Sequence, residues 1–148
     1  MTLMRSALMC LVYAQSPSHL ITPELLELAK KTYGDGIELQ LVSWGELVGD
    51  NAQSEDLEKL KLINAYFNKE ITFTSDSKHW HREDYWATPL ESLGTEAGDC
   101  EDFVIAKYFS LIQAGVEEAK LRITYVKALK LNQAHMVLAY YSSPRAVP

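Results

Sequence analysis

The sequence predicts an α+β fold in which one helix packs on an antiparallel sheet. Helical patterns come first along the 148 residues, the strongest of them covers residues 99–114, and two strand-like runs follow at 121–129 and 134–141. Helices followed by a block of strands, without regular alternation, are typical of α+β proteins. The chain has the length of one ordinary domain, and its 47% of hydrophobic residues is enough for a packed core.

The first fourteen residues, MTLMRSALMCLVYA, are typical of an export signal. Arg5 is the only charge, an apolar run follows it, and Val12 and Ala14 fit the small-residue pattern that precedes a cleavage site. The apolar run is too short to span a bilayer as a helix. We therefore predict a signal peptide at residues 1–14, an exported domain at residues 15–148 and no transmembrane segment in the mature chain. A frayed or buried N-terminal helix is the alternative.

The next segment predicts a helix over residues 22–33. Thr22 can cap its start, Pro23 suits the first turn, and Gly34 is a stop signal.

A second helix is expected over residues 54–69, with Ser54 as its cap. Apolar residues recur there at helical spacing: Leu57, Leu60, Ile63 and Phe67. The stretch at residues 35–53 is harder to assign, because Gly36, Gly45 and Gly49 are expected to break any long element.

Residues 70–98 form a long polar and aromatic segment, and segments of this length in a compact domain are often functional. His79 and His81 could be metal ligands. Surface histidines are the simpler interpretation, because no third ligand follows at a useful spacing.

The helix predicted over residues 99–114 begins with the most reactive candidate in the chain, Cys100. An apolar stripe (Phe103, Val104, Tyr108, Leu111 and Ile112) marks its buried face, and Gly115 ends it. A helix N-terminus favours a thiolate, which makes Cys100 a candidate nucleophile. His135 begins the last predicted strand and could serve as its general base. A buried, inert cysteine and a structural histidine are the alternative.

Composition excludes two classes of protein. With only two cysteines the chain cannot form a disulfide framework. Its formal net charge of -6 and the absence of any basic run argue against nucleic acid as a partner.

Three runs carry a resemblance to a known family: WATPLESLGTEAGDCEDFVIAKYFSLIQAG, LRITYVKAL and AHMVLAYY. Over roughly residues 20–148 the chain resembles the bacterial transglutaminase-like cysteine proteinases and, more narrowly, the LapG-type periplasmic proteases. The resemblance implies a papain/transglutaminase-like fold, with Cys100 as nucleophile and His135 as base. It also implies a calcium-dependent periplasmic endopeptidase that cleaves a large surface adhesin near its N-terminus, within a di-alanine motif, and so releases cells from a biofilm. An inner-membrane receptor that senses cyclic di-GMP would hold the protease away from its substrate.

The acids beside the cysteine have two interpretations. In the family they bind calcium, which maps onto Asp99 and Glu101, with Asp102 as a weaker candidate. From the residues alone, acids at a helix N-terminus can instead complement the helix dipole. Bare carboxylates oppose ionisation of the thiol, whereas a bound cation reverses that local effect.

The sequence departs from the family at one point. The family's third catalytic residue is an aspartate just after the final strand, but no acidic residue follows His135 here. We therefore expect a domain that is C-terminally truncated. Two alternative functions stay open, namely a transglutaminase or amidase on the same scaffold and a catalytically impaired binding module.

Overall fold

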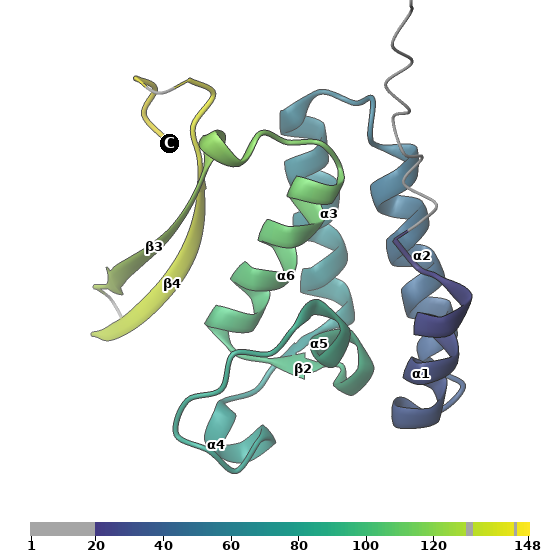
Figure 1. The fold of residues 1–148 in the computed structure, drawn as a ribbon. Coiled ribbons are helices and arrows are strands. Elements are labelled where there is room, and N and C mark those ends of the chain that lie inside the picture. Colours follow the sequence, from purple (N-terminus) through teal and green to yellow (C-terminus); the bar gives the residue numbers. More distant parts are fainter. Residues whose placement is uncertain (1–19, 130–131, 144) are drawn as a thin grey trace, which may run out of the picture.

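The computed structural model describes residues 20–129, 132–143 and 145–148 (Figure 1). The predicted signal peptide at residues 1–14 lies outside this part. In chain order the elements are α1 (Pro23–Tyr33), α2 (Ile37–Asp50), α3 (Asp56–Glu70), β1 (Thr72–Phe73), α4 (Asp76–His79), α5 (Pro89–Thr95), β2 (Ala97–Gly98), α6 (Cys100–Gln113), β3 (Leu121–Ala128) and β4 (Gln133–Tyr140). The predicted α+β order is confirmed.

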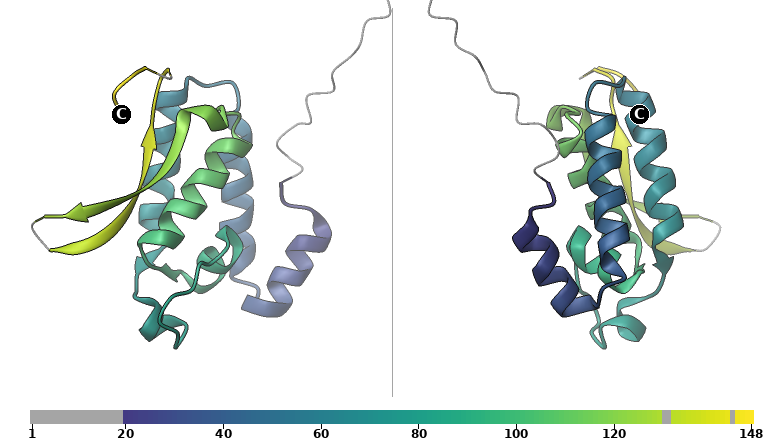
Figure 2. Two further views of the ribbon diagram at one scale, coloured as in Figure 1. Left: turned by 60° about the vertical axis from the view of Figure 1, so that its left-hand side comes forward. Right: turned by 90° about the vertical axis from the view of Figure 1, so that its right-hand side faces the viewer.

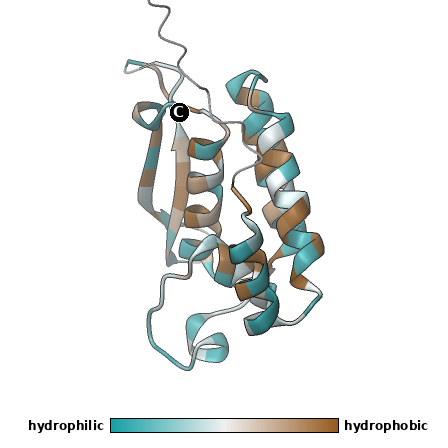
Figure 3. Ribbon diagram, turned by 45° about the vertical axis from the view of Figure 1, so that its right-hand side comes forward, coloured by the Kyte–Doolittle hydropathy of each residue, from teal (hydrophilic) through white to brown (hydrophobic). Residues whose placement is uncertain are grey.

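Helix α6 lies between the other helices and the β3–β4 hairpin (Figure 1). Helix α3 packs against it from one side and strand β4 from the other, while α1 packs on α2. The far end of the hairpin extends away from the helical body (Figure 2). Hydrophobic and hydrophilic residues alternate along the helices, as amphipathic packing requires (Figure 3).

Helix α1 has the predicted start and end. The Thr22 hydroxyl oxygen accepts a hydrogen bond from the Leu25 backbone N–H at 3.2 Å, and Pro23 occupies the first turn. Gly34 ends the helix at a φ of 88°, a conformation that favours glycine.

Helix α2 corrects the expectation that glycines break residues 35–53. Its buried residues recur at helical spacing: Ile37, Leu41, Trp44 and Val48. A Cβ at Gly45 would lie 3.1 Å from Ile21 Cγ1, so glycine is the residue that lets this segment approach the helix. Tertiary packing therefore outweighs the cost of a helical glycine, about 1 kcal/mol relative to alanine.

Helix α3 is confirmed, but the predicted cap is wrong. The helix begins at Asp56 with Glu55 at the cap position, and no side chain makes a capping hydrogen bond. The Ser54 hydroxyl instead donates to Asn51 Oδ1 at 3.4 Å.

The segment at residues 70–98 contains more structure than its composition suggests. Strands β1 and β2 form a short parallel pair in which Phe73 lies beside Gly98. Helix α5 starts with a capping box between Thr88 and Glu91. Because β2 runs directly into α6, this segment fixes the start of that helix.

The predicted hairpin is confirmed. Strands β3 and β4 pair antiparallel, with Val126 opposite His135 and Tyr125 opposite Met136. None of the helices within the described ranges is both long and apolar enough to cross a membrane.

Candidate active site

Cys100 is the first residue of helix α6 and is half-buried. Asp99 precedes it as the cap, and its Oδ1 accepts a hydrogen bond from the Glu101 backbone N–H at 3.1 Å. In turn, Asp102 Oδ2 accepts a hydrogen bond from the Asp99 backbone N–H at 3.1 Å, which completes a capping box. The acids around the cysteine therefore define where the helix begins.

Asp102 is fully buried, with 0% of its surface exposed, and both of its carboxylate oxygens are bonded to backbone N–H groups. Its Oδ1 accepts from Ala87 at 2.7 Å, so this side chain ties the segment before α5 to the start of α6. Burial raises the pKa of Asp102, although the two backbone hydrogen bonds act in the opposite direction. The hydrogen bonds of Asp102 therefore give it a structural role at the start of α6.

Gly98 belongs to the same arrangement. A Cβ at this position would lie 2.8 Å from Asp102 Cβ and 2.9 Å from Asp102 Oδ2. Contacts this short do not occur between real side chains, so the capping box excludes any larger residue than glycine at position 98.

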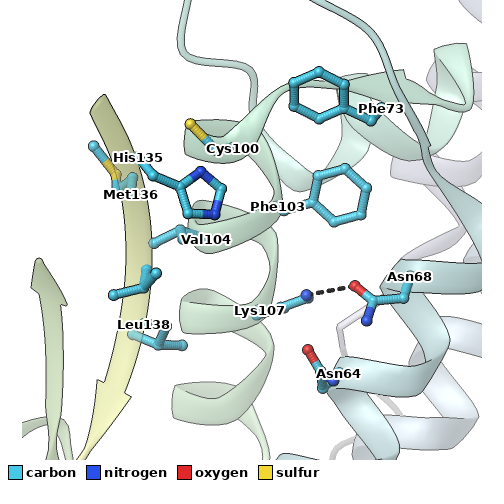
Figure 4. A pocket seen from close by; sticks show the side chains of 11 residues that line it. Asn64, Asn68, Phe73, Cys100, Phe103, Val104, Lys107, His135, Met136 and Leu138 are labelled. Carbon is cyan, nitrogen blue, oxygen red and sulfur yellow. Dashed lines mark hydrogen bonds between the residues drawn. The ribbon is translucent and has the colours of Figure 1, made fainter. Parts of the chain in front are cut away.

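The structure brings Cys100 and His135 to one hollow of about 410 Å3, between α3, α6 and β4 (Figure 4). His135 lies on β4 and is exposed, while its neighbour Met136 is buried. No hydrogen bond between Cys100 and His135 occurs among the described residues. The two side chains meet from separate elements, as a nucleophile and base require.

The thiol of Cys100 donates a hydrogen bond to Glu101 Oε2 at 2.8 Å, and the Tyr125 hydroxyl donates to Glu101 Oε1 at 3.1 Å. Burial and the Glu101 hydrogen bond raise the pKa of Cys100 to about 11, while the Met136 backbone N–H acts in the opposite direction. Burial would raise the pKa of Glu101, but hydrogen bonds from Cys100, Asp99 and Tyr125 outweigh it and lower that pKa. In this arrangement the thiol keeps its proton at neutral pH.

Asp76 is a functional candidate that the sequence analysis missed. One carboxylate oxygen from each of Asp76, Asp99 and Asp102 could bind a metal ion, and these three oxygens lie within 4.8 Å of one another. Asp76 is buried, its Oδ2 accepts from the Tyr85 backbone N–H at 2.5 Å, and its Oδ1 has no hydrogen-bond partner. The residue stands more than twenty positions before the cysteine in a polar segment, so no local motif could have marked it.

These acids fit a calcium ion. Burial raises the pKa of Asp99 to about 7, with further contributions from the Glu101 hydrogen bond and the charges of Glu101, Asp76 and Asp102. A hard cation with oxygen ligands would take the free Asp76 oxygen and offset the crowded negative charge.

Glu101 stands differently among the predicted ligands. One ligand atom from each of Asp99, Cys100 and Glu101 also lies within 4.8 Å of the others. Both Glu101 oxygens accept hydrogen bonds, from Cys100 and Tyr125, just as both Asp102 oxygens accept them from backbone N–H groups. The metal cluster with an unpaired oxygen is the one that contains Asp76.

The two loop histidines take no part in either acidic cluster within the described part of the chain. His79 Nε2 lies 3.0 Å from the Thr95 hydroxyl oxygen, and His81 is exposed.

Comparisons with known proteins place these residues in context. The family model of the bacterial transglutaminase-like cysteine proteinases (BTLCP) matches residues 43–143. Among solved structures, the chain is similar to Legionella pneumophila LapG, with 36% identity and a TM-score of 0.74 over 87% of this chain and 71% of that chain. An EGTA-treated LapG gives 36% identity and a TM-score of 0.74 over 87% of this chain and 69% of that one. A calcium-bound LapG gives 36% identity and a TM-score of 0.72, over 85% and 69%. No curated protein sequence matches the chain.

Proposed function

Because this chain belongs to the bacterial transglutaminase-like cysteine proteinases, we propose that it is a calcium-dependent cysteine endopeptidase of the periplasm. In this proposal Cys100 is the nucleophile and His135 the general base. The observation that carries it is the meeting of Cys100, at the N-terminus of α6, with His135, on β4, in one hollow. The periplasmic location is supported by the export signal expected at residues 1–14.

The proposed chemistry is acyl transfer to water. His135 takes the proton of the Cys100 thiol, and Sγ attacks the carbonyl carbon of the peptide bond. His135 then gives that proton to the leaving amine, and a water molecule hydrolyses the thioester that remains on the cysteine. The N-terminus of α6 favours the thiolate, since the helix dipole is positive there.

The thiol must leave Glu101 before this chemistry can start. In the structure Cys100 donates to Glu101 Oε2 at 2.8 Å. A rotation of the cysteine side chain away from Glu101 and toward His135 is the step that would convert the resting arrangement into the reactive one.

We propose that Asp76, Asp99 and Asp102 hold the calcium ion, with Glu101 as a further candidate ligand. When bound, calcium supplies positive charge that offsets the three carboxylates. The side chains of Asp99 and Asp102 keep the start of α6 in place through their backbone hydrogen bonds. Support comes from the free oxygen of Asp76 and from the existence of a calcium-bound LapG structure.

For the substrate we propose a large surface adhesin, cleaved near its N-terminus, so that cells are released from a biofilm. An inner-membrane receptor that senses cyclic di-GMP would control the access of the protease to this adhesin. These finer statements rest on the likeness to LapG. The family of cysteine proteinases itself implies a protein substrate.

The decisive experiment incubates the purified chain with the N-terminal part of an adhesin in the presence of calcium. We expect two fragments by mass spectrometry, and no cleavage after Cys100→Ala or after addition of a chelator. Cleavage that persists in the Cys100→Ala variant would refute the proposed nucleophile. A cross-linked product in the presence of an added amine would instead indicate a transglutaminase.

One observation favours a binding module as the second candidate. Within the described part of the chain, no carboxylate makes a hydrogen bond to His135, so no carboxylate there orients its ring. Removal of such a carboxylate costs orders of magnitude in rate in related catalytic triads. Binding of the adhesin or the receptor without any cleavage by the calcium-loaded wild type would support this candidate.

A further inference from the structure

The hollow that contains Cys100 continues along helix α6. A second hollow of about 290 Å3 lies beside it and shares Asn64, Lys107 and Leu138 with the first. Together they form one groove, with α6 as the floor and with α3 and β4 as the walls (Figure 4). We call this the α6 groove. It begins at the candidate nucleophile.

Lys107 is the half-buried cation of this groove, whereas Lys61, which also lines the second hollow, is exposed. The Lys107 Nζ donates to Asn68 Oδ1 at 2.6 Å and lies 5.1 Å from the centre of the Phe103 ring (Figure 4). Lys107 is half-buried, and this burial lowers the pKa of its amine.

Lys107 has no carboxylate partner among the described residues. By contrast, the partly buried Lys30 and Lys120 each have a carboxylate oxygen at 2.8 Å. Lys107 has only the neutral Asn68 amide oxygen and the ring of Phe103. A partly desolvated cation with neutral partners is incompletely compensated, so an anion from a ligand would complement it.

The distance between Cys100 and Lys107 along α6 predicts the position of that anion in a bound ligand. Lys107 follows Cys100 by seven residues, so the two lie on nearly the same face and about 10 Å apart along the helix axis. An extended peptide advances roughly 3.3 Å per residue. A peptide that lies in the α6 groove with its scissile bond at Cys100 therefore reaches Lys107 with its third residue from that bond.

We propose that the α6 groove binds the substrate in an extended conformation and that Lys107 binds an acidic side chain about three residues from the cleaved bond. This inference rests on the proposed peptidase function and adds a specificity-determining residue to it. Because the protein has a net charge of -6, binding of an acidic substrate group depends on local cations such as Lys107.

The test measures binding with the Cys100→Ala variant, so that no cleavage is needed. Fluorescent peptides of alanine and serine carry a central Ala–Ala bond and one Asp, three residues before or three residues after that bond. Each has a twin with Asn in place of Asp. We expect one of the Asp peptides to bind about tenfold more tightly than its Asn twin.

A second set of variants in the Cys100→Ala background tests the residue. Lys107→Met should abolish the difference between Asp and Asn, while Lys107→Arg should keep most of it. Lys31→Met is the matched control, because it removes one charge at an exposed position of α1 and should leave the difference unchanged. Far-UV circular dichroism of each variant checks that it folds.

Equal dissociation constants for Asp and Asn peptides on both sides of the bond overturn the inference, and so does the absence of binding by all four. An equal loss of affinity for both twins in Lys107→Met also overturns it, since that would be a structural effect. The proposed function is judged separately, by whether the wild-type protein cleaves the adhesin fragment. A preference for Asp that appears without cleavage would uphold the anionic subsite and refute the peptidase.

Discussion

Replacing Gly98 with alanine tests whether close packing against Asp102 holds the start of helix α6. The added Cβ would lie 2.8 Å from Asp102 Cβ, whereas carbon atoms in favourable contact are roughly 3.5–4.0 Å apart. Either the Asp102 side chain or the backbone must therefore move by about 1 Å. Both carboxylate oxygens of Asp102 accept backbone hydrogen bonds, at 2.7 and 3.1 Å, and a shift of that size weakens both.

The magnitude follows from these contacts. A hydrogen bond to a charged group contributes about 1.5–3 kcal/mol net, and overpacking typically costs about 1–3 kcal/mol. If Asp102 moves, its hydrogen bonds weaken; if it stays, the overpacking remains. Because the two costs are alternatives and do not add in full, we expect Gly98→Ala to lower the free energy of unfolding by about 3 kcal/mol. This is a large fraction of the roughly 5–15 kcal/mol typical of a domain.

The assay is urea unfolding followed by tryptophan fluorescence, with a chelator present so that bound metal does not contribute. Gly36→Ala is the matched control, since nothing lies within 4 Å of its added Cβ and its φ of -58° suits alanine. We expect that variant to change stability by no more than about 1 kcal/mol. If Gly98→Ala is as well tolerated as Gly36→Ala, the packing argument for the helix start is wrong.

Three further predictions concern other parts of the structure. Asp76→Asn should weaken calcium binding at least tenfold in isothermal titration calorimetry, because it removes the charge of the oxygen that lacks a partner; unchanged affinity would place the ion elsewhere. The pKa of Asp56 lies below its ordinary 3.8 because of its hydrogen bond to Lys120, so the pair stabilises the fold above pH 4 and loses that effect as the pH falls through the folded pKa. Asp56→Asn should therefore cost about 0.5 kcal/mol in urea unfolding at neutral pH, and a difference that persists in strong acid would contradict this. Trp44→Phe removes the Nε1 hydrogen bond to the Ser110 hydroxyl at 2.8 Å and should cost about 1–2 kcal/mol by circular dichroism, since the pair is buried; an unchanged unfolding midpoint would refute that contribution.

Elements with local signals were predictable from the sequence. Helix α1 carries its cap, its proline and its terminal glycine within thirteen residues, and the hairpin shows two strand-like runs around a short gap. Helix α2 was not predictable in this way. The approach of Ile21 to Gly45 involves residues far apart in the chain, and propensity alone treats such a glycine as a breaker.

Part of the site was predictable from the sequence, including His135, which lies 35 residues after Cys100. Cys100 and its flanking acids stand together in the sequence, and the structure brings His135 to the same hollow. Asp76 joins the acids only because β1, α4 and β2 fold the intervening segment back toward α6. The proposed role of Asp76 depends on its burial and on its unpaired oxygen, neither of which composition can reveal.

The capping box at the start of α6 has a consequence for how this protein can be engineered or can evolve. Asp99 and Asp102 hold the helix start through backbone hydrogen bonds, and the charge of Asp99 also acts on the Cys100 thiol. A substitution that made the thiol more reactive by removing Asp99 would also loosen the helix that carries it. The reactivity of the thiol and the stability of the helix start are therefore coupled within residues 98–102. A change that alters the reactivity alone has to come from residues outside this stretch. Tyr125 is an example, because it acts on the thiol through its hydrogen bond to Glu101.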